Sequence, residues 1–242
     1  KETHEINWSA ESSEKSGFDS FMLKEIYEQP TIIRNILSKH ITANNQIHFS
    51  HLNTDKNQLA TVARFIIQAC GTSWHAGLIG EYLIESFAEL PVEVELASEF
   101  RYRQPVIDEH CLVIAITQSG ETADTLAALA MEAQRRQAHG DPAFAPRQLG
   151  VTNRPESSLS RQVPHILDIG AGIEVGVAAT KTFLGQLLAF YGLAIAFAAR
   201  RGARPAADIK ALADELRGLP QQLRQLVDLH DQRSEALAPR FA

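Results

Sequence analysis

The sequence has few cysteines, no concentrated run of one charge and no long uninterrupted apolar segment. Its 2 cysteines, Cys70 and Cys111, cannot form a disulfide framework, and both lie in apolar, strand-like segments that suit a reducing, cytoplasmic compartment. The 23 Lys and Arg against 29 Asp and Glu give a net charge of −6 without a basic cluster, which argues against a general nucleic-acid-binding protein. The most apolar stretch, 183–199, is interrupted by Gln186 and Tyr191 within the roughly 18 residues of a membrane span. We therefore expect a buried helix there and no membrane partner.

Two classes of ligand motif are also missing. The sequence contains neither GxGxxG nor GxxxxGK[ST], the glycine-rich patterns that bind dinucleotides and nucleotide triphosphates. Its 9 histidines form no HxH or HxxxH pair of the kind that binds zinc. We expect no nucleotide, no cofactor and no metal site.

With 242 residues and 45% hydrophobic content, the chain is long enough for one large domain with appendages. Its composition suggests four segments. We predict an inter-domain linker at 1–17, an N-terminal helical lead-in at 18–57, the main domain at 58–203 and a helical connector at 204–242. The chain begins at Lys1 rather than Met, and no residue pattern that marks the end of a domain precedes its last residue. We therefore expect it to be a piece of a longer protein.

Alternation of short apolar runs with helical periodicity predicts an α/β fold. A doubly wound parallel sheet of about five strands in a three-layer αβα arrangement fits this pattern best. The predicted strands are 64–70, 92–96, 111–117, 148–152 and 165–169, and the predicted helices between and after them are 74–88, 123–139 and 177–200. Flanking helices are expected from Asp19 to about His40, where Pro30 either begins a second helix or kinks one, and at 206–218 and 220–229.

The central feature is the stretch 111–122. Its first half, Cys111–Ile116, is continuously apolar and typical of a strand buried on both faces. A turn of small polar residues, Thr117 to Thr122, follows and opens a helix, and a similar turn, Cys70–Ser73, follows another strand. The start of a helix offers free N–H groups and the positive end of its dipole, so we expect these turns to bind a phosphate. The alternative is a polar turn that caps a helix without any ligand.

Several polar residues near these turns have two possible roles. Glu121 is either a general base or, as its position beside a phosphate favours, a charge at a helix N-terminus or an interface contact. Glu174 and Lys181 either act as an acid–base pair or have separate structural roles. Cys70 is either a reactive thiol at a helix start or a small buried residue at a strand end, and the second role is favoured.

Four motifs resemble those of the sugar isomerase (SIS) domain family. They are Ala69–Ser73 (ACGTS), Ser98–Arg103 (SEFRYR), Gln118–Thr125 (QSGETADT) and Glu174–Lys181 (EVGVAATK). The resemblance implies a substrate-binding set that contacts the phosphate and the sugar. This set is Cys70, Gly71, Thr72, Ser73, Thr117, Gln118, Ser119, Thr122 and the backbone around Val177. The family often has Ser where this chain has Thr117, and the extra methyl could narrow the pocket.

Lys24–Pro30 (KEIYEQP) narrows the resemblance to SIS enzymes that transfer glutamine-derived ammonia to fructose 6-phosphate and form glucosamine 6-phosphate. The catalytic residues of such enzymes have no counterpart in this sequence, so the resemblance implies a chain that binds the sugar phosphate without converting it. It also implies a glutaminase domain and a second SIS domain in the full protein, and a homodimer. Two alternatives remain open: a stand-alone regulatory SIS module, and an assembly module that presents Lys24–Pro30 and Glu99–Arg103 to a second protomer.

Overall fold

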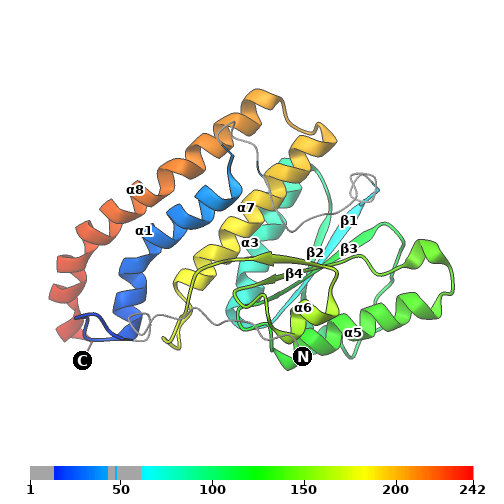
Figure 1. The fold of residues 1–242 in the computed structure, drawn as a ribbon, viewed down its shortest axis with the longest axis horizontal. Helices are drawn as coiled ribbons and strands as arrows, with labels where there is room; N and C mark the ends of the chain where they lie inside the picture. Colours follow the sequence, from blue (N-terminus) through cyan, green and yellow to red (C-terminus); the bar gives the residue numbers. More distant parts are fainter. Residues whose placement is uncertain (1–13, 43–46, 48–60, 242) are drawn as a thin grey trace.

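A five-stranded parallel sheet lies at the centre of the protein (Figure 1). The computed structural model describes residues 14–42, 47 and 61–241. The strands follow the order β2-β1-β3-β4-β5 across the sheet. Their bounds are Arg64–Ala69 (β1), Val92–Leu96 (β2), Cys111–Thr117 (β3), Gln148–Thr152 (β4) and His165–Asp168 (β5). This confirms the predicted α/β class and places β2, whose sequence alternates, at one edge.

Helices cover both faces of the sheet and form three layers (Figure 1). One face packs on α3 (Gly71–Ala88) and α7 (Lys181–Arg201), with α1 (Phe21–His40) and α8 (Ala206–Leu237) outside α7. The other face packs on α4 (Ala97–Phe100), α5 (Ala123–Ala138) and α6 (Ser158–Gln162). Two short 3-10 helices, η2 (Pro142–Phe144) and η3 (Ala238–Arg240), complete the described secondary structure. Two apolar cores result, one on each side of the sheet.

The central strand β3 is buried along its whole length, because apolar helices cover it on both faces. The helix that follows it, α5, carries a buried ion pair between Glu132 and Arg136. Arg136 also donates to the carbonyl oxygens of Cys111 and Asp108, both at 3.1 Å, and Gln148 donates to Glu132 at 2.7 Å. These bonds satisfy the buried charges and fix α5 against the beginnings of β3 and β4.

α3 and α7 approach each other more closely than ordinary side chains would permit. A Cβ atom added at Gly80 of α3 would lie 2.4 Å from the ring of Phe190 of α7, and Phe190 is fully buried. One phenylalanine therefore fills the space left by the missing side chain. The contact joins the helix that follows β1 to the helix that follows β5 and brings their starts together.

Some predicted element bounds are wrong. The helix expected from Val177 begins at Lys181, since Gly176 to Thr180 form an irregular segment, and the helix expected from Trp74 begins at Gly71. The two helices expected after 206 are one helix, α8, which continues through Pro220, and α1 likewise continues through Pro30. The short helices α4 and α6 were not predicted. The linker expected at 1–17 and the last part of the helical lead-in expected at 18–57 lie largely outside the described residues.

By length and composition, α7 is the one helix among the described residues that could cross a membrane, with a mean hydropathy of 1.7 over its most apolar window. Of that window, 67% is buried inside the protein. Contacts with α1, α3 and α8 account for this burial. The helix therefore has the surroundings of a core helix, as its interrupted sequence predicted.

Candidate functional site

The strand order places the candidate site where the chain reverses direction across the sheet. β1 and β3 are neighbours, and the connections that follow them lead to opposite faces, α3 to one and α5 to the other. Ligands of doubly wound sheets bind in the crevice beyond the carboxyl ends of the strands at such a point. The two polar turns singled out in the sequence, at 70–73 and 117–122, follow these two strands.

The turn after β3 is held by its own side chains. The hydroxyl oxygens of Thr117 and Thr122 are 2.6 Å apart, and Ser119 Oγ accepts a hydrogen bond from the Glu121 N–H at 3.1 Å. Gly120 has φ +68°, and a Cβ there would lie 1.9 Å from Ser157 Oγ, so only glycine fits. Ser119 Oγ also lies 3.4 Å from the Thr117 hydroxyl. The three hydroxyls of Thr117, Ser119 and Thr122 therefore share two contacts, and one of their protons is left to donate to a ligand.

The turn after β1 is joined to α7. The side-chain amide of Gln186 donates to Ser73 Oγ at 2.9 Å, although the two residues are 113 positions apart in the sequence. Both side chains are buried, and Gln186 Oε1 has no partner among the described residues. The bond fixes the Ser73 hydroxyl beside the start of α3 and leaves its proton free to donate.

The third wall of the site is the irregular segment between β5 and α7, residues 170–180. Asn153, which follows β4, holds its beginning by accepting from the Ala171 N–H at 2.8 Å and donating to the Gly172 carbonyl at 2.6 Å. Glu174 holds its end by accepting from the N–H groups of Thr180 at 2.9 Å and Thr182 at 3.3 Å. It also accepts from the hydroxyls of both threonines.

These contacts distinguish the three helix starts around the site. α3 and α5 begin at the two polar turns without a side chain capping their N–H groups. At the start of α7, in contrast, the N–H groups of Thr180 and Thr182 already donate to the carboxylate of Glu174. Free N–H groups and two positive dipole ends thus remain for an anion at the turns after β1 and β3.

The three walls enclose a polar cavity of about 230 Å³. Of the nine substrate-binding residues that the sequence suggested, seven line it: Thr72, Ser73, Thr117, Gln118, Ser119, Thr122 and Val177. Cys70 and Gly71 do not line it; Cys70 precedes α3 and packs with the core under α5. Among the described lining residues, Glu174 is the only one with a charged side chain. Hydroxyls and backbone groups, without Lys or Arg, therefore form the candidate anion site.

The structure gives other roles to the remaining charged candidates. Glu121 lies outside the cavity and accepts from the Ser158 N–H at the start of α6 at 2.8 Å, and this backbone hydrogen bond lowers the pKa of its carboxyl. Lys181 is buried and pairs with Glu28 of α1 at 2.6 Å rather than with Glu174. Neither Glu121 nor Lys181 points to acid–base chemistry at this cavity.

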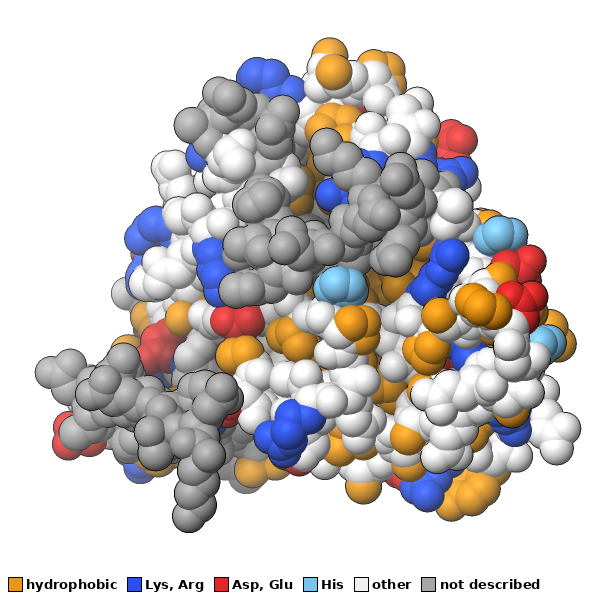
Figure 2. Space-filling view, turned by 45° about the vertical axis from the view of Figure 1, so that its right-hand side comes forward, with side chains coloured by type: hydrophobic (Ala, Val, Ile, Leu, Met, Phe, Trp, Pro, Cys, Tyr) orange, Lys and Arg blue, Asp and Glu red, His pale blue; other side chains and the backbone are white. Residues whose placement is uncertain are grey.

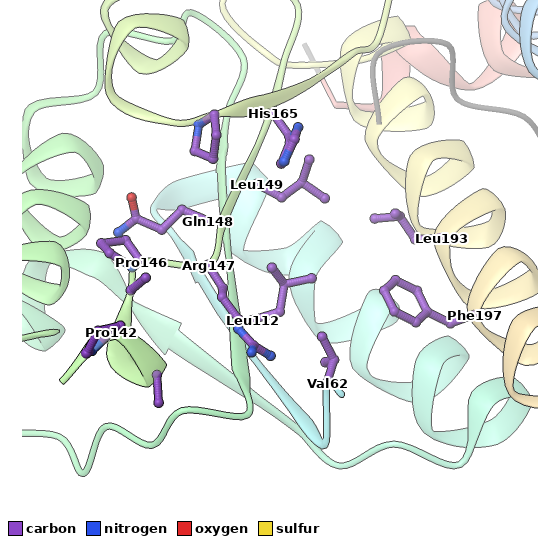
Figure 3. Close-up of a pocket in the computed structure, with 13 residues that line it drawn as sticks. Val62, Leu112, Pro142, Pro146, Arg147, Gln148, Leu149, His165, Leu193 and Phe197 are labelled. Atoms are coloured by element: carbon purple, nitrogen blue, oxygen red, sulfur yellow. The ribbon is translucent and has the colours of Figure 1, made fainter. Parts of the chain in front are cut away.

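A larger hollow of about 450 Å³ lies at the opposite, amino-terminal edge of the sheet. Figure 3 shows that apolar side chains of Val62, Leu112, Leu193 and Phe197 converge on it. His165 lies on its rim, where partial burial lowers the pKa of the imidazole. Among the described elements, none of the helices has an N-terminus with free N–H groups that faces this hollow. The hollow is therefore suited to apolar contacts rather than to binding an anion.

Two ligand classes find little support on the described surface. On the face that Figure 2 shows, Lys and Arg side chains are scattered and do not gather into a basic patch of the kind that binds nucleic acid. Within residues 14–42 and 61–241, no group of three or more His, Cys, Asp or Glu side chains is placed to hold a metal ion.

Sequence reasoning missed Gln186 and Glu25 and left Glu174 unresolved. Gln186 interrupts an apolar helix, a weak signal that marked it only as an obstacle to a membrane span. Glu25 lies in α1, distant in sequence from the cavity, and reaches the 170–180 segment only through the fold. No local pattern could have assigned either contact.

Comparison with known proteins gives a consistent result. The sequence model of the SIS domain family matches residues 58–196. The chain is 49% identical over 240 residues to the glutamine–fructose-6-phosphate aminotransferase [isomerizing] of Thermosynechococcus vestitus and 47% identical over 243 residues to that of Synechocystis. Each alignment covers 98% of this chain and 38% of the relative, so the chain spans well under half of their length.

A solved structure shows the same fold. The C-terminal domain of glucosamine-fructose-6-phosphate aminotransferase from Francisella tularensis superposes with a TM-score of 0.81 at 33% identity. The match covers 93% of this chain and 61% of that structure. It therefore includes α1 and α8, which lie outside the 58–196 match, as well as the sheet.

Proposed function

Because this chain belongs to the SIS domain family, we propose that its polar cavity binds the phosphate ester of a sugar. The phosphate occupies the turns after β1 and β3, and the sugar lies toward Gln186 and the segment that carries Val177. The substrate-binding set we propose is Ser73, Thr117, Gln118, Ser119, Thr122 and Val177, with Thr72, Gly71 and Cys70 forming the adjacent turn.

The observation that carries this proposal is the convergence of two uncapped helix starts with free hydroxyl donors. α3 and α5 begin at the cavity, and the Ser73 hydroxyl accepts a bond from Gln186, which leaves its proton for a ligand. Thr117, Ser119 and Thr122 share two hydroxyl contacts, so one hydroxyl proton of this turn remains beside that of Ser73. A phosphate accepts several such donors at once, and it needs no Lys or Arg in this geometry.

The relatives suggest the reaction in which this binding takes part. Two of them are named glutamine–fructose-6-phosphate aminotransferases, and we propose fructose 6-phosphate as ligand and glucosamine 6-phosphate as product of the full protein. The 242 residues bind the sugar phosphate, and catalytic residues, a glutaminase domain and a second SIS domain belong to sequence beyond them. We further propose that the full protein is a homodimer and that it is cytoplasmic. We also propose that the four segments of this chain are divided after residues 17, 57 and 203.

A binding titration of this chain tests the proposal. We expect fructose 6-phosphate and glucosamine 6-phosphate to bind in the micromolar to millimolar range typical of small metabolites, and plain fructose to bind far more weakly. Ser119→Ala removes a donor to a charged group, and Thr122→Val removes a hydroxyl while keeping its shape. Each should weaken binding by about tenfold or more, since a hydrogen bond to a charged group contributes about 1.5–3 kcal/mol.

The matched control is Ser234→Ala, which removes an exposed hydroxyl in α8 outside the cavity. It should bind fructose 6-phosphate as the wild type does. Equal binding of plain fructose and its phosphate, or wild-type affinity in both cavity variants, would refute the phosphate site.

A further inference from the structure

The segment 170–180, which forms the third wall of the cavity, has no helix or strand of its own. Glu174, Gly176, Val177 and Ala179 from this segment line the cavity. Backbone groups in an irregular segment still need hydrogen-bond partners, and the position of the wall depends on what supplies them. Asn153 and Glu174 supply some from within the domain, and α1 supplies others.

Glu25 of α1 is the partner at the middle of the segment. Its side chain is 98% buried, with 2% of the residue exposed, and its carboxylate accepts from the Val175 N–H at 2.6 Å and the Gly176 N–H at 3.2 Å. A Cβ at Gly176 would lie 2.6 Å from Glu25 Oε2, so the glycine allows the backbone to approach the carboxylate. Charge-assisted bonds of this kind are among the strongest in proteins.

Glu28, one turn further along α1, holds the other end of the segment. Its carboxylate lies 2.6 Å from the ammonium of Lys181, the first residue of α7, whose side chain is 5% exposed. The Glu28 side chain is 33% exposed, so the pair is only part-buried, but removing Glu28 would leave the buried Lys181 ammonium without this partner. Glu25 and Glu28 thus fix the chain just before and just after Val177.

Neither carboxylate touches the turns where the phosphate is expected. Those turns are held by Thr117, Ser119, Thr122 and the Ser73–Gln186 bond. α1 also lies outside residues 58–196, the part that the family model matches. Two walls of the cavity are therefore built by the matched domain alone, and the third is positioned in part from outside it.

We infer that Glu25 and Glu28 are positioning residues that set the sugar-facing wall of the cavity and so determine affinity for the sugar portion of the ligand. The inference rests on the proposed function. It makes α1 a part of the binding site, although no residue of α1 lines the cavity in the structure.

The test compares two ligands, fructose 6-phosphate and inorganic phosphate, on the 242-residue chain with Glu25→Ala and Glu25→Gln. In Glu25→Ala the wall loses its partner, and we expect affinity for fructose 6-phosphate to fall about tenfold while affinity for inorganic phosphate stays within about twofold. In Glu25→Gln an amide oxygen can still accept an N–H, so part of the lost affinity should return. The control is Asn35→Ala, an exposed position on the same helix, which should bind both ligands as the wild type does.

The outcomes separate the two proposals. If the wild type binds neither ligand, the proposed function fails and this inference fails with it. If the wild type binds fructose 6-phosphate and Glu25→Ala binds it equally well, only the positioning role is refuted. An equal loss of affinity for both ligands in a folded variant would also refute the positioning role, because it would indicate that the whole cavity is disturbed and not the sugar-facing wall alone.

Gly176→Ala provides a second route in case Glu25→Ala does not fold. The added methyl would clash with the Glu25 carboxylate and displace the wall, whereas Glu25 and the other charged side chains remain in the protein. We expect the same selective loss of fructose 6-phosphate. Wild-type affinity for both ligands in this variant would contradict the inference independently.

Discussion

At the scale of single residues, the two cysteines differ in their surroundings. Cys111 begins β3, is fully buried, and burial raises the pKa of its thiol to about 11. Cys70 is only half-buried, between the end of β1 and the start of α3. Since the thiolate is the reactive form, burial makes Cys111 both inaccessible and chemically inert.

This difference predicts the outcome of alkylation. In a Cys70→Ser variant at pH 8, about one Cys111 thiol in a thousand would be ionised even if reagent could reach it. We expect no iodoacetamide adduct on the native variant, by mass spectrometry, and complete modification in denaturant. Rapid modification of the native variant would show that β3 is less well covered than the structure indicates.

Residues within one turn could be interpreted from the sequence, whereas residues whose partners are distant could not. The hydroxyls of Thr117, Ser119 and Thr122 stood out because they follow an apolar strand directly. The roles of Glu174 and Lys181 could not be decided, because each depends on its partners: threonines at the start of α7 for one and Glu28, 153 residues away, for the other. Only the fold brings such partners together.

At the scale of elements, the packing of α3 on α7 depends on the absence of a side chain at Gly80. Gly80→Ala would place a methyl against the Phe190 ring. Overpacking of a close contact costs about 1–3 kcal/mol, and for a chain of this size each kcal/mol lowers the unfolding temperature by about 2–4 °C. Calorimetry should show this decrease, and it should be smaller when Phe190→Leu provides room.

The matched control is another helical glycine. At Gly218 in α8, the nearest atom to an added Cβ is Gln222 Nε2 at 3.6 Å, an ordinary contact. Gly218→Ala should therefore stabilise the protein by about 0.5–1 kcal/mol through helix propensity alone. A loss of stability in both variants, or in neither, would mean that Phe190 does not limit residue 80.

Element types were more predictable than element bounds. Four of the five strands were visible as short, mainly apolar runs, because burial in a parallel sheet selects apolar residues along the whole strand. The edge strand β2 was visible by its alternation of apolar residues with Glu. Pro220 suggested a break between two helices, yet α8 continues through it with the proline buried. Tertiary packing of α8 on α1 accounts for this result, which a local preference cannot predict.

At the scale of the whole molecule, the strand order determines where the site lies. No sequence pattern specified this strand order. The pattern predicted that the carboxyl ends of all strands lie at one edge, but it did not show which two strands are neighbours. The pairing of β1 with β3, and not with β2 alone, brings the turns at 70–73 and 117–122 together. Their similarity suggested this juxtaposition, and the sheet order gives its geometry.

The arrangement of α1 and α8 predicts that the family-matched part of the chain is not sufficient by itself. Ile33, Ile36 and Leu37 of α1 belong to the main core, and removing α1 would uncover the apolar α7. A chain that begins at residue 61 should unfold at a lower temperature than the 242-residue chain and bind a dye for exposed apolar surface. Equal unfolding temperatures for the chains that begin at residues 1 and 61 would contradict this role of α1.

The bond between Gln186 and Ser73 has a consequence for the thermodynamics of recognition. It joins α7 to α3, which are also in close contact at Gly80, so the turn after β1 is held against the helix that follows the third wall. Side chains that are already immobile lose little entropy when a ligand arrives, and affinity then reflects the contacts themselves. This part of the cavity is in this sense preorganised by folding, because a ligand does not have to bring α3 and α7 together.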